Sequence, residues 1–71
     1  MERDYPEILT LKQCQEILQI GKNLMLYLVH NEEIPAVRVG KQWRIRRMDL
    51  DGYIEEQTQL YKNEPKFEYI A

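Results

Sequence analysis

The chain has 71 residues, 44% of them hydrophobic, and a formal net charge of −2. This length predicts one domain with a small core, and no apolar run is long enough to span a membrane or to direct secretion. The only cysteine, Cys14, excludes a disulfide within the chain and leaves a metal site without thiolate partners. We therefore expect a cytoplasmic protein without a metal or another cofactor.

The charges are unevenly distributed along the sequence. Five basic residues and no acidic residue lie between Arg38 and Arg47, whereas the stretch after Met48 carries six acidic residues against two lysines. The distribution of charge predicts binding partners better than its sum does. The basic stretch therefore permits a nucleic-acid partner in spite of the negative net charge.

The first predicted helix begins at Thr10. Residues 1–6 show no periodicity, and we expect residues 1–7 to form a flexible N-terminus. A short strand is expected at residues 7–9. Thr10 is a preferred N-cap, and Gln13 lies three residues later, where a capping-box partner reaches back to the Thr10 amide. Apolar residues at helical spacing then predict a buried stripe of Leu11, Cys14, Ile17 and Leu18. Cys14 is thus expected to be a core residue rather than a nucleophile.

A second helix is predicted for residues 22–29, after a short turn that contains Gly21. Two short helices joined by such a turn are typical of a helix-turn-helix unit, although any pair of antiparallel helices has a similar pattern. The second helix has too many apolar residues for one narrow buried stripe: Leu24, Met25, Leu26, Leu28 and Val29. Some of them must therefore face solvent or a partner.

The start of the second helix carries candidate DNA contacts. Lys22 and Asn23 have side chains that can reach phosphates and base edges, and Tyr27 shares a face with Asn23 because it lies four residues later. The alternative for Tyr27 is a partly exposed ring that packs on the following hairpin.

A basic β-hairpin is predicted after Pro35. Apolar Val37, Val39, Trp43 and Ile45 alternate with basic Arg38, Arg44 and Arg46 on both sides of the break Gly40-Lys41-Gln42. This alternation predicts a buried apolar face and an outward face on which all the basic side chains project together. We take the following hairpin residues as candidate DNA contacts: Arg38, Lys41, Gln42, Arg44 and Arg46. The alternative is a solvated hairpin whose charges only prevent pairing of its edge.

A third helix is predicted from about Asp49 to Lys62. Asp49 and Asp51 favour a helix N-terminus, and the sequence from Lys62 to Pro65 is a credible signal for the end of the helix. Helical spacing continues through Leu50, Tyr53, Ile54, Gln57 and Tyr61. Gly52 lies inside this helix at a cost of about 1 kcal/mol relative to Ala, which suggests that another element approaches it closely.

The expected core joins the hairpin to the first two helices. Its predicted members are Leu18, Leu28, Val37, Trp43 and Ile45. The predicted domain covers residues 8–62 and the remaining residues 63–71 form a C-terminal tail. Phe67, Tyr69 and Ile70 have no obvious core position in this tail, so we expect them to contact a protein, with a disordered or self-packing tail as the alternative.

The order helix, turn, helix, basic hairpin, helix predicts an α+β fold, a small winged helix-turn-helix with the hairpin as its wing. The stretches ILTLKQCQEIL, IGKN, EEIPAVRVG, QWRIRR and DLDGYIEE resemble the excisionase family, whose fold is related to MerR-type winged helices. The resemblance covers about residues 8–56 and is most specific in IPAVRVGKQWRI. It implies that the helix opening at Lys22 is the recognition helix and that Arg44 lies in a DNA-contacting wing. Glu32 stands where this family commonly has Gly, so we expect Asn31 to adopt the left-handed conformation instead.

The resemblance implies a role with a tyrosine recombinase. Excisionases bind and bend double-stranded DNA at an attachment site and help an integrase to excise a mobile element, while other proteins of this build regulate transcription. We expect a protein that is a monomer free in solution and that meets the integrase and neighbouring copies on DNA.

Two classes of function thus remain from the sequence. The first is a sequence-specific DNA-binding protein without catalytic activity, and the second is a winged-helix protein-interaction module. An enzyme is not expected, because the sequence shows no nucleophile–base pair, no phosphate-binding Gly loop and no cluster of metal ligands.

Overall fold

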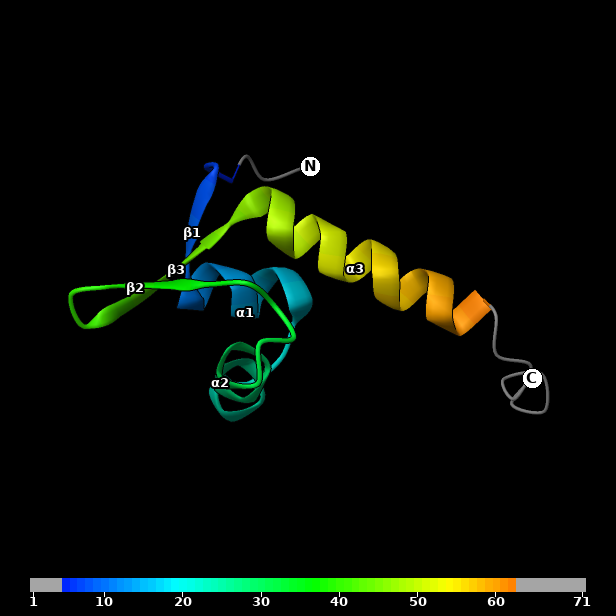
Figure 1. Cartoon of the computed structure of the whole chain (residues 1–71), viewed down its shortest axis with the longest axis horizontal. Coiled ribbons are helices and arrows are strands. Elements are labelled where there is room, and N and C mark those ends of the chain that lie inside the picture. Colours follow the sequence, from blue (N-terminus) through cyan, green and yellow to red (C-terminus); the bar gives the residue numbers. More distant parts are fainter. Residues whose placement is uncertain (1–4, 63–71) are drawn as a thin grey trace.

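A computed structural model of the chain describes residues 5–62. The elements follow the order β1 (Ile8–Thr10), α1 (Leu11–Leu18), α2 (Lys22–His30), β2 (Val37–Val39), β3 (Gln42–Arg46) and α3 (Arg47–Lys62). Figure 1 shows α1 and α2 below a small sheet, with the β2–β3 hairpin reaching to one side and α3 to the other. The α+β winged helix-turn-helix architecture predicted from the sequence is confirmed.

The start of α1 is fixed by the predicted capping box. The Gln13 amide donates to Thr10 Oγ1 at 3.1 Å, and the Thr10 amide donates to Gln13 Oε1 at 2.9 Å. The helix ends at Gln19, whose φ of 58° is left-handed, and the Ile20 amide then donates to the Gln15 carbonyl at 3.1 Å. Gly21 has φ −79°, so the turn between α1 and α2 does not need the conformational freedom of glycine.

The end of α2 differs from the prediction. Asn31 has φ −92°, and the left-handed residue is Glu32 with φ 59°. The expectation for Asn31 is wrong because the chain reverses one residue later. The Glu33 amide donates to the Leu28 carbonyl at 2.9 Å and thereby closes the helix end around Glu32. Ile34, the next residue, is fully buried.

The sheet has three strands, because β1 pairs with β3 as well as β2. The strand order is β1-β3-β2, and both pairs are antiparallel. The pairing places Leu9 opposite Ile45 in the core. The residues just before β1 are hydrogen-bonded to the start of α3. The Arg47 guanidinium donates to the Tyr5 carbonyl and the Arg47 amide donates to the Glu7 carbonyl, both at 2.7 Å.

The register of the β2–β3 hairpin overturns the predicted faces. The loop has two residues, Gly40 and Lys41, and Gln42 belongs to β3, so Arg38 lies opposite Trp43 and Val37 opposite Arg44. The prediction assumed a three-residue break, which would have kept odd-numbered residues of both strands on one face. A two-residue loop exchanges the faces, because side chains directly opposite each other project to the same side.

The core lies between the sheet and the three helices. Its buried residues are Leu9, Cys14, Met25, Leu28, Val29, Ile34, Ile45 and Leu50. Ile45 and Leu28 are thus buried as predicted, whereas Leu18 and Trp43 are partly buried and pack against this cluster. Val37 was wrongly predicted as a core residue, because the register turns it outward and leaves 61% of it exposed.

Helix α3 packs on the core through its first half. Leu50 is fully buried and Tyr53 and Ile54 are partly buried, whereas Leu60 is 53% exposed, and the helix extends away from the body (Figure 1). The expected close approach at Gly52 is wrong, since a Cβ added there would meet nothing within 4 Å.

Two expectations fall on parts of the chain that the structure does not describe. Residues 1–4 belong to the predicted N-terminal segment, and residues 63–71 form the predicted tail with Phe67, Tyr69 and Ile70; both lie outside the described residues. Within residues 5–62, no helix has the length and apolar character needed to cross a membrane.

Candidate nucleic-acid interface

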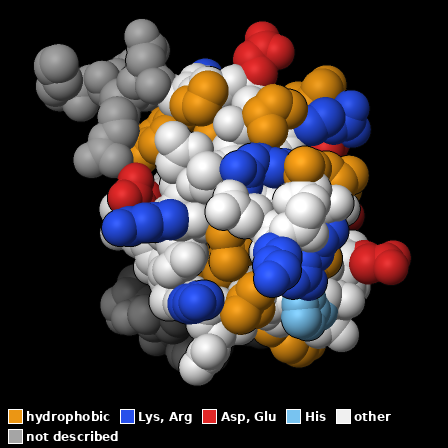
Figure 2. Space-filling model, turned by 90° about the vertical axis from the view of Figure 1, so that its left-hand side faces the viewer, with side chains coloured by type: hydrophobic (Ala, Val, Ile, Leu, Met, Phe, Trp, Pro, Cys, Tyr) orange, Lys and Arg blue, Asp and Glu red, His pale blue; other side chains and the backbone are white. Residues whose placement is uncertain are grey.

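A basic groove lies between the N-terminus of α1, helix α2 and the wing, which we define as residues 37–46. It is lined by Thr10, Leu11, Lys12, Lys22, Leu26, Arg38, Lys41, Gln42, Trp43 and Arg44. Five of the ten basic residues of the chain are in this set, and no carboxylate lines the groove among residues 5–62. Figure 2 shows the wing side of the molecule, where basic side chains spread across the surface and acidic ones lie near its edge.

Lys12 is a member of this groove that the sequence reasoning missed. It is exposed in the first turn of α1, and this turn lies beside the wing because Thr10 pairs with Arg44. A cation is unfavourable at a helix N-terminus, where the helix dipole is positive. Lys12 is therefore placed at the groove by the pairing of β1 with β3 and not by a preference of its own helix.

The N-terminus of α2 contributes Lys22 to the same groove. Its N-cap is Gly21, which makes no side-chain hydrogen bond, and neither α1 nor α2 has an acidic residue in its first turn. The positive end of the α2 dipole and the Lys22 ammonium therefore add to one electrostatic field. Such a field favours an anion such as a phosphate group.

The wing contributes cations that differ in their freedom. Lys41 is exposed in the loop at the wing tip. Arg44 is half-buried, and its guanidinium donates to the Trp43 carbonyl and to Gln42 Oε1, both at 2.9 Å. These bonds hold Arg44 and Gln42 together at the groove. Arg38 is exposed on the inner face of the wing, and its Cζ lies 5.0 Å from the centroid of the Trp43 ring.

Arg46 does not line this groove. It lies at the end of β3, where its guanidinium donates to the two carboxylate oxygens of Asp49 at 2.7 and 3.2 Å. The hydrogen bond and the negative charge of Asp49 raise the pKa of Arg46 above its ordinary value. The Asp49 carboxylate thus compensates the charge of Arg46. In the groove, by contrast, no carboxylate of the described residues lies among the cations.

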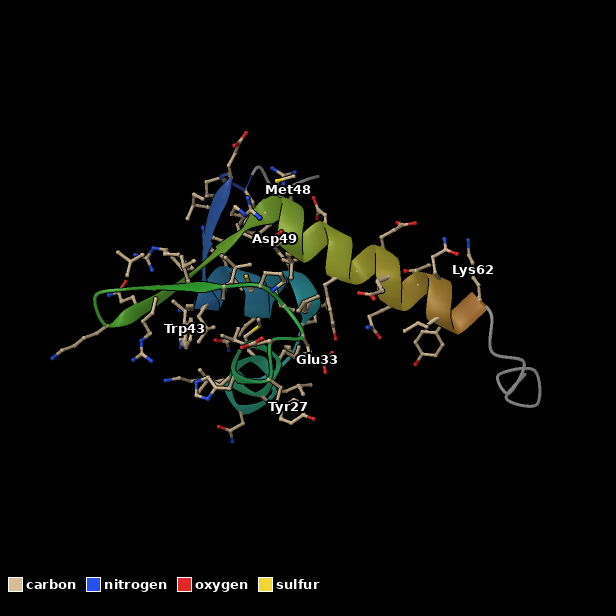
Figure 3. The ribbon with its side chains drawn as sticks, in the orientation of Figure 1. Tyr27, Glu33, Trp43, Met48, Asp49 and Lys62 are labelled. Carbon is tan, nitrogen blue, oxygen red and sulfur yellow. The ribbon has the colours of Figure 1, made fainter. Side chains whose placement is uncertain are left out.

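The face of α2 that points away from the core carries Asn23 and Tyr27. Both are exposed, and they lie opposite the buried residues Met25 and Val29. Tyr27 is 57% exposed and lies on the side of α2 away from the wing (Figure 3), which excludes the alternative of a ring packed on the hairpin. The expectation that some apolar residues of this helix face outward is confirmed by Leu24, which is 49% exposed.

The side chains that line the groove are suited to binding an anion. Among residues 5–62 there is no group of three or more His, Cys, Asp or Glu residues that could hold a metal ion. Burial raises the pKa of the Cys14 thiol from 9.0 to about 11, which keeps it protonated and unreactive at neutral pH. The groups that the groove offers to a polyanion are its five cations and the side-chain amide of Gln42.

Comparison with known proteins gives a family match over most of the chain. Residues 8–58 match the family model of a helix-turn-helix domain. Two proteins of Mycobacterium tuberculosis, from strains H37Rv and CDC 1551 / Oshkosh, bear names that describe them provisionally as DNA-binding proteins. Each is 33% identical to this chain over 49 residues, which cover 69% of this chain but only 63% of the relative. No solved structure matches the chain.

Proposed function

Because the chain belongs to this helix-turn-helix domain family, we propose that it binds double-stranded DNA in a sequence-specific manner and has no catalytic activity. The observation that carries the proposal is the groove. Five cations from α1, α2 and the wing converge there without a carboxylate among the described residues, and α2 presents a polar and apolar face beside it.

The proposed binding mode has two parts. Helix α2 enters the major groove, which admits one α-helix, and Asn23 and Tyr27 contact base edges. Lys12, Lys22 and the wing contact the phosphates on either side, which fixes the orientation of the protein but carries no sequence information. In the wing these contacts come from Arg38, Lys41, Gln42 and Arg44.

At a finer level we propose that the protein is an excisionase. It would bind and bend attachment-site DNA, together with neighbouring copies and a tyrosine recombinase, in the cytoplasm. This proposal is supported by the resemblance of residues 8–56 to that family, which includes the wing sequence IPAVRVGKQWRI. A transcriptional regulator of the same fold would use the same groove and is the second candidate.

A protein-interaction module is the remaining alternative, and one observation favours it. The outer face of the sheet exposes apolar side chains, namely Ile8, Val37 and Val39 at 52%, 61% and 60%. Exposed apolar residues that cluster on one face can mark a protein contact. A DNA-binding protein can also carry such a face, so the alternative differs from our proposal in whether duplex DNA binds at all.

A DNA-binding assay with the wild-type protein and Asn23→Ala tests the proposal. We expect the wild type to prefer the attachment-site duplex over a scrambled duplex in fluorescence anisotropy. Asn23→Ala should lose about 1–3 kcal/mol on the preferred duplex and little on the scrambled one, because a base contact is lost and phosphate contacts remain. No binding to any duplex at low salt would refute DNA binding.

A recombination assay separates the two finer candidates. A plasmid that carries the attachment sites is incubated with the integrase, with and without the protein. An excisionase increases the excised product, whereas a regulator binds promoter DNA and leaves the excised product unchanged.

A further inference from the structure

We propose that Trp43 is a positioning residue that holds Arg38 ready for a DNA phosphate and connects the wing to the recognition helix. The inference rests on the proposed DNA binding and adds a role for two residues that the family match does not assign. Its basis is a stack of side chains from three elements: Arg38 of β2, Trp43 of β3 and His30 of α2.

The geometry of the stack follows from the register of the wing. Because Arg38 lies opposite Trp43, both side chains project from the inner face toward α2, and the Arg38 Cζ lies 5.0 Å from the Trp43 ring centroid. This distance is within the range of a cation–π contact. On the α2 side, the His30 and Trp43 ring centroids are 5.6 Å apart with an interplanar angle of 53°. Figure 3 shows Trp43 on the side of the wing that faces α2.

The exposure of the three side chains fits a packed ring that holds an accessible cation. Trp43 is partly buried and packs against the core, so its ring has a fixed position. Arg38 and His30 are exposed and can be reached by a ligand. The ring therefore connects an exposed cation with the packed part of the domain.

The contact with the Trp43 ring also leaves the hydrogen-bond donors of Arg38 available. A guanidinium that lies over an aromatic ring uses its face, while its N–H groups lie in its plane and point outward. The Arg38 side chain makes no hydrogen bond or ion pair among residues 5–62, in contrast to Arg44, whose guanidinium donates to two acceptors in the wing. An arginine that is already ordered loses less side-chain entropy when it binds a phosphate. Trp43 would thus increase affinity without touching DNA.

A double-mutant cycle on DNA binding tests this role. We expect Arg38→Ala and Trp43→Leu each to weaken binding to any duplex, with about 2- to 5-fold of the loss coming from the cation–π contact. In the Trp43→Leu background, Arg38→Ala should have a much smaller effect than in the wild type, because the arginine is no longer positioned. Trp43→Phe, which keeps an aromatic ring, should restore most of the affinity. If the loss of affinity in the double variant equals the product of the losses in the two single variants, the proposal is overturned.

Fluorescence provides a readout that does not depend on DNA or on the Leu variant. Trp43 is the only tryptophan of the chain, so its emission reports on this ring alone. We expect acrylamide to quench Trp43 more strongly in Arg38→Ala than in the wild type, because the guanidinium no longer covers the ring. Equal quenching in both proteins would show that the stack is absent in solution and would overturn the proposal even if Trp43→Leu does not fold.

The two assays distinguish the possible failures. If the wild type binds no duplex, the proposed function fails and the positioning role fails with it, whatever the fluorescence shows. If the wild type binds DNA but the cycle shows no coupling, the DNA-binding proposal stands and only the role of Trp43 is lost.

Discussion

Val37 and Arg44 lie directly opposite each other on β2 and β3, and their side chains share the outer face of the sheet. Val37 is 61% exposed there, whereas the inner face of the same pair of strands carries Arg38 and Trp43. The wing therefore presents basic side chains on both of its faces. Only the inner face, with Arg38, faces helix α2.

The exposure of Val37 leads to a prediction about stability. Val37→Thr should change the free energy of unfolding by less than about 0.5 kcal/mol, because the side chain contributes little burial. Ile45→Thr, the same replacement at the fully buried position of β3, should cost about 2 kcal/mol or more. Urea denaturation of both variants measures the difference. A larger loss for Val37→Thr would mean that the wing has the opposite register.

Replacing Gly52 of α3 and Gly40 of the wing with alanine should have opposite effects on the stability of the protein. Gly52→Ala should stabilise the protein by about 1 kcal/mol, because the position is helical and a Cβ there meets nothing within 4 Å. Gly40→Ala should destabilise it by about 1 kcal/mol, since Gly40 has φ +64° in the two-residue loop. Thermal unfolding followed by circular dichroism compares them. A lower melting temperature for Gly52→Ala would indicate that the added Cβ clashes with a neighbouring group, which the structure of the described residues does not show.

Burial of Cys14 predicts both its reactivity and a pH dependence. The folded protein should react slowly with an aromatic disulfide reagent at pH 8, and the reaction should become fast in urea. The pKa of Cys14 is raised from 9.0 to about 11 in the fold, so the thiol form is favoured by folding. Its contribution to stability is full below pH 9 and is lost as the pH rises toward 11. Cys14→Ala should lack this loss, and rapid reaction in the folded state would show that the thiol is accessible.

Local features of the fold were predictable from the sequence, because they depend on neighbouring residues. The Thr10–Gln13 capping box, the helix that opens at Lys22 and the presence of a hairpin after Pro35 all follow from short patterns. The burial of Cys14 also followed from the helical spacing of the apolar residues around it.

The remaining features depend on exact loop geometry or on contacts between distant residues. One residue more or less in the wing loop decides whether Arg38 or Val37 faces α2, and alternation along the strands is the same in both cases. Lys12 joins the groove only because β1 pairs with β3, which no local pattern around Lys12 shows. The choice of Glu32 over Asn31 as the left-handed residue depends on how Ile34 enters the core.

We expect the groove between α1, α2 and the wing to bind the phosphates of DNA. A protein that neutralises phosphates releases counterions, so the logarithm of its affinity falls linearly with the logarithm of the salt concentration. Each phosphate contact adds about one unit to this slope. The slope therefore counts the contacts and can be compared between variants.

The most direct measurement is this slope for three lysine variants of the full chain, each bound to the same duplex. Lys12→Ala and Lys41→Ala lie in the groove, and Lys62→Ala is the matched control at the far end of α3 (Figure 3). We expect each groove variant to lower the slope by about one unit, while the control keeps the wild-type slope. A wild-type slope in both groove variants, or an equal decrease in Lys62→Ala, would show that the groove does not bind DNA phosphates.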